Sequence, residues 1–116
     1  PGLTELDLAA RLAKLGWTTL LWPQLDRVDL VASSSDGERR VAIDVKDYFS
    51  PARLSARFSG FKTYEADHAC YLAIPDYLAA TDPRFAVRFE ALRASSGKPP
   101  VDLRTTADLV AELGAA

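Results

Sequence analysis

The chain has 116 residues and carries 14 basic and 16 acidic side chains, so its formal net charge is −2. This length predicts one domain that buries roughly two thirds of its surface on folding, and the 48% apolar residues supply a core, which excludes disordered and collagen-like architectures. The slight acidity disfavours bulk adhesion to duplex nucleic acid, since such binders display a basic face, but it is compatible with local basic patches.

The few cysteine and histidine residues limit the chemistry further. Cys70 and His68 are each the only residue of their type, which excludes an internal disulfide and a Cys/His zinc cage and favours a reduced, cytoplasmic setting. No uncharged apolar run approaches the ~20 residues of a membrane helix, and no secretion signal is recognisable, so no membrane partner is expected. The chain begins at Pro1-Gly2 without a methionine, as an excised segment does, so a larger parent protein is kept open as one alternative.

The first element predicted is a helix over residues 3–15, where Leu8, Leu12 and Leu15 form an apolar stripe at helical spacing. Thr4 is expected to cap it, and Gly16 to end it. Glu5 lies beside the stripe, which directs a carboxylate towards the edge of the core.

Three strands should follow this helix. Residues 17–22 and 27–32 are rich in strand-forming residues, and Pro23 closes the first of these runs. The dipeptide Asp36-Gly37 is a strong hairpin signal, so the return strand is predicted over residues 40–47.

The rest of the chain alternates helix and strand. Ser50-Pro51 is a helix start, followed by an apolar stripe of Leu54, Phe58 and Phe61, and residues 69–74 form a buried strand. A third helix opens at Asp82-Pro83 with a stripe of Phe85, Phe89 and Leu92, and a short strand at 101–103 leads into a last helix from about residue 106. This order predicts an α/β fold in which helices cover a mixed sheet.

The chemistry is concentrated in two of the strands. Over residues 40–47 the alternation places Ala42, Asp44 and Lys46 on one face, and Asp29 lies in the middle of the preceding strand. A carboxylate within an apolar strand costs several kcal/mol to desolvate unless something compensates for its charge, and a hard cation does so. Two such carboxylates favour a Mg²⁺ or Mn²⁺ site that leaves positions open for water and substrate, with the Lys46 ammonium aimed at the same point. The alternative is a salt-bridge network on a solvated sheet face.

At these residues the chain resembles the PD-(D/E)xK nuclease superfamily, which has the restriction-endonuclease-like fold. That fold runs helix, three-stranded meander, helix, strand, and the resemblance covers residues 3–75 of a single domain 1–116, with 76–116 as a helical and strand extension. Asp29, Asp44 and Lys46 match the three motif positions, although no proline precedes Asp29 and Asp26 is a rival aspartate. The segments GW, LWP and VAIDVKDY are also similar to small nuclease domains associated with prokaryotic Piwi-like defence proteins.

The resemblance implies metal-dependent hydrolysis of nucleic-acid phosphodiester bonds, with DNA favoured over RNA, in a prokaryotic defence or DNA-processing system. It implies metal ligation by Asp29, Asp44, the Val45 carbonyl and Glu5, with Lys46 assisting the attacking water. A homodimer and a Piwi-like partner are further expectations. The alternative is a catalytically inactive nuclease-fold module that binds nucleic acid or a partner protein.

Other side chains have weaker assignments. Arg53, Arg57 and Lys62 are candidate phosphate contacts, with a solvated helix face as the alternative. His68 is interpreted as a histidine at a strand edge and Cys70 as a core residue, while Tyr48 and Tyr64 are candidates for lining a groove. Five aromatic residues are assigned to the core: Trp17, Trp22, Phe58, Phe61 and Phe85.

Overall fold

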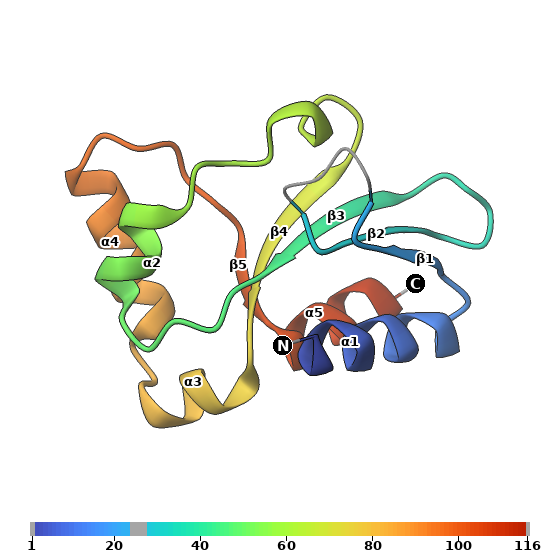
Figure 1. Cartoon of the computed structure of the whole chain (residues 1–116), viewed down its shortest axis with the longest axis horizontal. Coiled ribbons are helices and arrows are strands. Elements are labelled where there is room, and N and C mark those ends of the chain that lie inside the picture. The colour runs from blue at the N-terminus through green and yellow to red at the C-terminus, as the bar shows by residue number, and fades with distance from the viewer. Residues whose placement is uncertain (1, 24–27, 116) are drawn as a thin grey trace.

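The computed structural model describes residues 2–23 and 28–115 (Figure 1). Its elements in chain order are α1 (Leu3–Lys14), β1 (Thr18–Leu21), β2 (Leu30–Ser33), β3 (Arg40–Val45), α2 (Pro51–Arg57), the 3₁₀ turn η1 (Lys62–Tyr64), β4 (Ala69–Ile74), α3 (Asp76–Thr81), α4 (Phe85–Ser95), β5 (Leu103–Thr105) and α5 (Thr106–Gly114). The α/β class and the hairpin between β2 and β3 are confirmed.

The five strands form one mixed sheet in the order β1-β2-β3-β4-β5. The first three strands are antiparallel neighbours, whereas β3, β4 and β5 run parallel to one another. Both connections between parallel neighbours contain helices. Parallel pairing needs such a long crossover, because the chain must return to the end of the sheet at which the previous strand began. The strands β3 and β4 therefore end at the same edge of the sheet, where their following segments meet.

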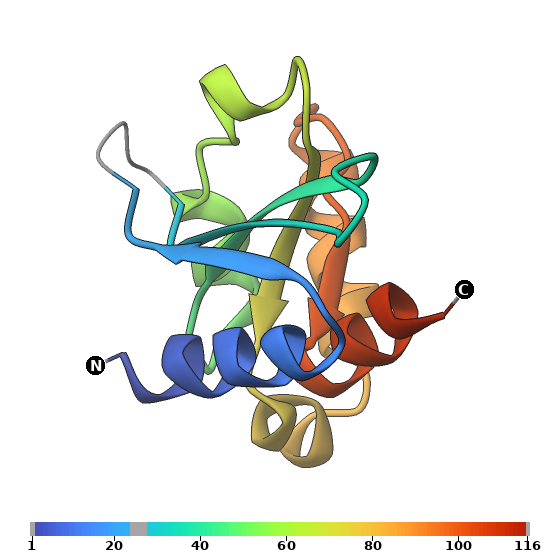
Figure 2. The ribbon, with the colours of Figure 1, turned by 90° about the vertical axis from the view of Figure 1, so that its right-hand side faces the viewer.

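Helices cover both faces of this sheet (Figures 1 and 2). On one face α1 and α5 pack over Ile43 and Ala73, while on the other α2 and α4 pack over Ala42 and Leu72. Residues 76–115 contribute to both cores, through Phe85 and Phe89 on one side and Leu109 and Leu113 on the other. The middle of β3 is consequently buried on both faces, and this decides the environment of any polar side chain there.

Helix α1 ends as predicted but begins differently. Trp17 N–H donates to the Leu12 carbonyl at 3.1 Å and Gly16 N–H to the Ala13 carbonyl at 3.0 Å, with Gly16 at φ 91°, which is a Schellman end. The prediction that Thr4 caps the helix is wrong, because the N-cap is Gly2 and Thr4 lies inside the first turn.

Helix α2 begins where the sequence predicts and ends early. The Ser50 hydroxyl accepts a hydrogen bond from Arg53 N–H at 3.2 Å, and Pro51 occupies the first helical position. The helix stops at Arg57, yet Phe58 and Phe61 still reach the core because the chain turns back towards the sheet after the helix, with Gly60 at φ 104°.

Two predicted core positions are wrong, and a buried charge stands next to one of them. Leu15 and Leu92 are at least one-third exposed, and Arg93 is buried next to Leu92 instead. Its guanidinium lies over the rings of Phe58 and Phe89 and donates from Nε to the Pro99 carbonyl at 2.9 Å. A long cation thus fills the space between α2 and α4, which the leucine spacing does not reveal. The short helix α3 and the turn η1 are likewise absent from the sequence prediction.

Leu12 in α1 and Leu15 at its C-cap test which side of this helix packs against the core. Leu12 is 0% exposed and Leu15 43% exposed. Leu12→Ala is expected to lower the free energy of unfolding by about 2–5 kcal/mol, since it leaves a cavity, and Leu15→Ala by less than about 1 kcal/mol. Urea unfolding followed by circular dichroism measures both, and equal losses would contradict the assigned core.

Candidate active site

The candidate site lies where β2 begins and β3 ends. Asp29 N–H donates to the Ile43 carbonyl at 3.0 Å, although the strand register pairs Ile43 with Leu30. Two consecutive residues, Asp29 and Leu30, therefore oppose one residue of β3, which is the arrangement of a β-bulge. Such an irregularity changes the direction of the side chain at its extra residue, here Asp29.

The carboxylate of Asp29 is held by the backbone of β3. Its Oδ2 accepts a hydrogen bond from Val45 N–H at 2.7 Å, a short distance typical of a charge-assisted bond. On the opposite side of β3, Lys46 N–H donates to the Ala73 carbonyl of β4 at 2.9 Å. The peptide groups of Val45 thus point away from β4 and towards Asp29, because consecutive residues of a strand bond to opposite neighbours.

Asp44 is the most unusual acidic residue of the site. It lies within β3 on the face that carries Ala42 and is 6% exposed. Its burial, together with an interaction with the Asp29 carboxyl, raises the pKa of Asp44 to about 7, while the nearby Lys46 ammonium acts in the opposite direction. Without a further cation, the Asp44 carboxyl is therefore about half protonated near neutral pH.

Lys46 contributes the positive charge. Its Nζ lies 3.4 Å from Asp44 Oδ2, and its side chain is about one-third exposed, so the ammonium joins the buried carboxylate to solvent. The predicted common face of Asp44 and Lys46 is thus observed, as is the convergence of Asp29, Asp44 and Lys46.

Glu5 is placed differently from these three residues. It is half-buried in the first turn of α1, and that helix covers the face of the sheet opposite to the one that carries Asp44. Among residues 2–23 and 28–115, no three His, Cys, Asp or Glu side chains are grouped so as to hold a metal ion. Metal ligation by Glu5 stays a prediction, and the rival Asp26 lies outside the described residues.

The donor chemistry nevertheless fits a hard divalent cation. The buried Asp44 carboxyl keeps a raised pKa beside Asp29 in spite of the nearby Lys46 ammonium, so a further cation would stabilise its ionised form, and Mg²⁺ or Mn²⁺ binds carboxylate and carbonyl oxygens. The orientation of the Val45 peptide group adds a carbonyl on the Asp29 side, consistent with the predicted ligand. Mg²⁺ usually retains several waters, so few protein ligands are needed.

The remaining predicted residues lie outside this cluster. Arg53, Arg57 and Lys62 are exposed on α2 and η1. His68 precedes β4 and shares a hydrogen bond of 2.7 Å between its Nδ1 and Asp67 Oδ1, in agreement with a strand-edge role. Cys70 is only half-buried, and its burial raises the pKa of the thiol to about 11, so it is no ready nucleophile.

The aromatic predictions divide in two. Trp17, Phe58, Phe61 and Phe85 are buried as predicted, whereas the core prediction for Trp22 is wrong, because its side chain is 52% exposed. Tyr48 and Tyr64 pack against the core on the side of α2 and α4.

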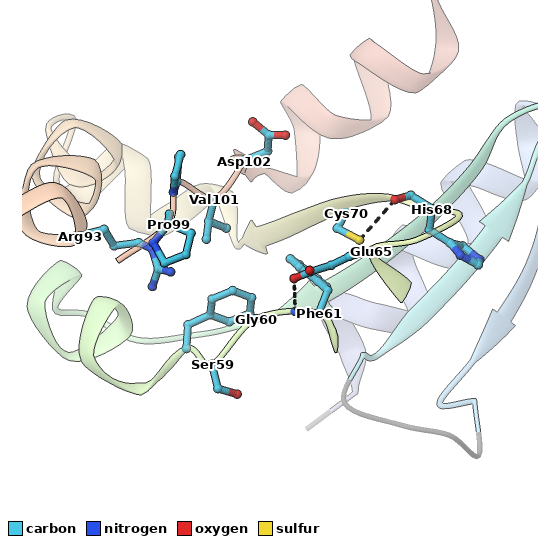
Figure 3. Close-up of a pocket in the computed structure, with 12 residues that line it drawn as sticks. Ser59, Gly60, Phe61, Glu65, His68, Cys70, Arg93, Pro99, Val101 and Asp102 are labelled. Carbon is cyan, nitrogen blue, oxygen red and sulfur yellow. Dashed lines mark hydrogen bonds between the residues drawn. The ribbon is translucent and has the colours of Figure 1, made fainter. Parts of the chain in front are cut away.

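A separate cavity of about 420 Å³ lies between the segment 58–61 and the segment 99–102 (Figure 3). Arg93 and Asp102 approach it from one side, and Glu65, His68 and Cys70 from the other (Figure 3). Phe61 N–H donates a hydrogen bond to Glu65 Oε1 at 3.4 Å, which links two of the lining residues. None of Asp29, Asp44 and Lys46 lines this cavity, which sequence reasoning did not anticipate because its lining residues are scattered along the chain.

A five-stranded mixed sheet that brings two aspartates and a lysine to one strand end has the features of a restriction-endonuclease-like domain. Comparison with family models gives the same class: residues 2–116 match the family described as "REase associating with pPIWI_RE". The chain belongs to this family, whose domains are linked to prokaryotic Piwi-like proteins, and the resemblance noted in the sequence is confirmed. No curated protein and no solved structure gives a significant match.

Membership of this family indicates the general class of function and does not specify a substrate or a reaction. It supports a nuclease-like role in a Piwi-related system. In the part of the chain that the structure describes, no helix is both long enough and apolar enough to cross a membrane.

The raised pKa of Asp44 leads to a test of stability against pH. The folded chain keeps a proton on Asp44 up to about pH 7, whereas an unfolded aspartate loses it near 3.8, so between these values the folded state binds more protons. In metal-free buffer the contribution of Asp44 to the free energy of unfolding must therefore fall as the pH rises from about 4 to 7. Asp44→Asn is expected to remove this loss and to be more stable than the parent at pH 8, by on the order of a few kcal/mol.

Urea unfolding at several pH values in EDTA measures this difference. Glu38→Gln, which changes an exposed carboxylate, is the matched control and should leave the pH profile unaltered. A variant Asp44→Asn whose stability parallels that of the parent between pH 4 and 8 would show that Asp44 titrates normally.

Proposed function

We propose that the chain is a divalent-metal-dependent nuclease that hydrolyses nucleic-acid phosphodiester bonds. The observation that carries this proposal is the buried Asp44 carboxyl with its raised pKa, placed against Asp29 and within 3.4 Å of the Lys46 ammonium. Burying one acid against a second is unfavourable in a merely structural site, and it is useful where a cation binds.

In this proposal Asp29, Asp44 and the Val45 carbonyl hold Mg²⁺ or Mn²⁺, with Glu5 as a further ligand. The bound cation supplies Lewis acidity for the phosphoryl group and lowers the pKa of a coordinated water. The hydrogen bond from Val45 N–H fixes Asp29, so that the carboxylate needs no reorganisation when substrate arrives. Lys46 reaches solvent beside Asp44 and orients the attacking water or stabilises the charge that develops on the phosphoryl oxygens.

The exposed cations of α2 and η1 complete the proposal. Arg53, Arg57 and Lys62 would hold the phosphates that flank the scissile bond, which positions a strand without reading its sequence. We take DNA as the favoured substrate and a Piwi-like protein as the partner, in line with the family description, and a homodimer would supply two sites for cutting both strands.

A second candidate is an inactive nuclease-fold module that binds nucleic acid or a partner protein. The observation in its favour is that, among the described residues, the site assembles two carboxylates and not three. Such a module would keep the metal or nucleic-acid affinity without cutting.

Metal titration and cleavage together separate these candidates. Mg²⁺ or Mn²⁺ is expected to raise the melting temperature of the parent, since a ligand at 100 times its Kd stabilises the folded state by about 2.7 kcal/mol. Asp44→Ala should lose this stabilisation and all cleavage, because it removes a ligand. Lys46→Ala should keep the metal effect but cut labelled DNA roughly 10²–10³-fold more slowly.

Lys14→Ala, which removes an exposed lysine on α1, is the matched control and should behave like the parent. Metal stabilisation without any cleavage by the parent would favour the inactive module. Absence of any metal effect, with Asp44→Ala tolerated, would leave a salt-bridge network as the account of this site.

A further inference from the structure

An exposed aromatic pair lies beside the candidate site. Phe49 is 75% exposed and Tyr77 47% exposed, and their ring centroids are 6.3 Å apart at an interplanar angle of 54°. Single exposed apolar residues are common, but two large rings in contact at the surface, outside the core, form a continuous aromatic surface.

The position of this pair follows from the ends of β3 and β4. These strands are parallel and stop at the same edge of the sheet, where Lys46 N–H bonds to the Ala73 carbonyl. Phe49 follows Lys46 by three residues, so the chain between them spans at most about 10 Å. Tyr77 lies in the first turn of α3, just after β4, and its hydroxyl faces the carboxylate of Asp47, the residue next to Lys46.

Helix capping does not account for Phe49. It precedes the N-cap Ser50, a position from which an apolar side chain often packs on the fourth helical residue, here Leu54. Leu54 is fully buried while Phe49 is three-quarters exposed, so most of the ring surface is not used by such a contact. The neighbouring cap bond from Arg53 N–H to the Ser50 hydroxyl fixes the backbone that carries the ring.

The backbone that bonds to Asp29 carries another exposed ring. The Trp22 side chain is 52% exposed, and the backbone N–H of Trp22 donates to the backbone carbonyl of Asp29 at 2.8 Å. The Trp22 ring itself lies against Gly2 at the start of α1, so Phe49 and Tyr77 are the exposed rings placed next to Lys46. The candidate substrate offers one group that such rings bind, the face of a base.

We infer that the site takes single-stranded nucleic acid, with Phe49, supported by Tyr77, as a platform on which an unpaired base stacks. This inference rests on the proposed function and names its substrate class. In a duplex both faces of each base are covered by its neighbours, so only an unpaired or extruded base offers a face to Phe49. Stacking also supplies affinity that a chain of net charge −2 cannot gain from a broad basic face.

Binding without metal tests the inference, because no cleavage then interferes. Fluorescence anisotropy in EDTA compares labelled oligodeoxythymidylate, oligouridylate and a mixed-sequence duplex of equal length. The parent is expected to bind single strands more tightly than the duplex, and Phe49→Ala to weaken single-strand binding about tenfold or more while leaving duplex binding unchanged. Phe49→Trp should restore it, and the two single-strand probes tell whether DNA or RNA is preferred.

Two controls separate stacking from charge and from misfolding. Val87→Ala, an exposed apolar change on α4, should leave binding unaltered, and melting curves confirm that Phe49→Ala is folded. Phe49→Ala should preserve the dependence of affinity on salt, whereas Arg53→Ala should reduce it. Single-strand affinity within twofold of the parent in Phe49→Ala, or an equal loss for single strands and duplex, overturns the inference.

The proposed function can fail independently. If the parent cleaves DNA with metal and Phe49→Ala cleaves and binds single strands equally well, the nuclease stands and the stacking platform is refuted. If Phe49 determines single-strand binding but no metal supports cleavage, the platform stands on the inactive module instead.

Discussion

The burial of the Asp44 carboxyl against a second carboxyl is the constraint on which the site depends. A charged aspartate within a strand that is covered on both faces needs compensation, and Lys46 supplies it only in part, since the pKa of Asp44 is still raised to about 7. The Asp44 carboxyl is therefore poised between binding a proton and facing a bound cation. Its chemistry at neutral pH is decided by which of the two is present.

The fold creates this situation through the layers around β3. Helices α1 and α5 close one face, and α2 and α4 close the other, so Asp44 shares its face with the buried Ala42. The parallel neighbour β4 accepts the hydrogen bond from Lys46 N–H. Val45 N–H therefore points to the other side of β3, where it donates to the Asp29 carboxylate. The backbone hydrogen bonds of three strands thus orient the first carboxylate, and the helices set the dielectric environment of the second.

Much of this arrangement could be predicted because its signals are local. The hairpin follows from Asp36-Gly37, the start of α2 from Ser50-Pro51, and the shared face of Asp44 and Lys46 from strand alternation. The bulge at Asp29 could not be predicted, since it depends on how two strands are paired rather than on either one alone.

Other features were not predicted because tertiary packing overrides the spacing of apolar residues along the sequence. The leucine pattern of α4 favours Leu92 as a core residue, yet Arg93 is buried because aromatic rings and the Pro99 carbonyl, distant in sequence, accept its guanidinium. Trp22 has the composition of a core residue and is half-exposed at the end of an edge strand. The placement of Glu5 depends on how α1 crosses the sheet, which periodicity along the helix does not specify.

The most direct test of the central claim is the titration of Asp44 itself, followed by the carboxyl ¹³C chemical shift in NMR spectra with and without Mg²⁺. In EDTA we expect a midpoint near pH 7, and with Mg²⁺ a midpoint displaced well below it, because the cation favours the ionised form. A midpoint near the ordinary aspartate value of about 4, unchanged by Mg²⁺, would contradict this claim.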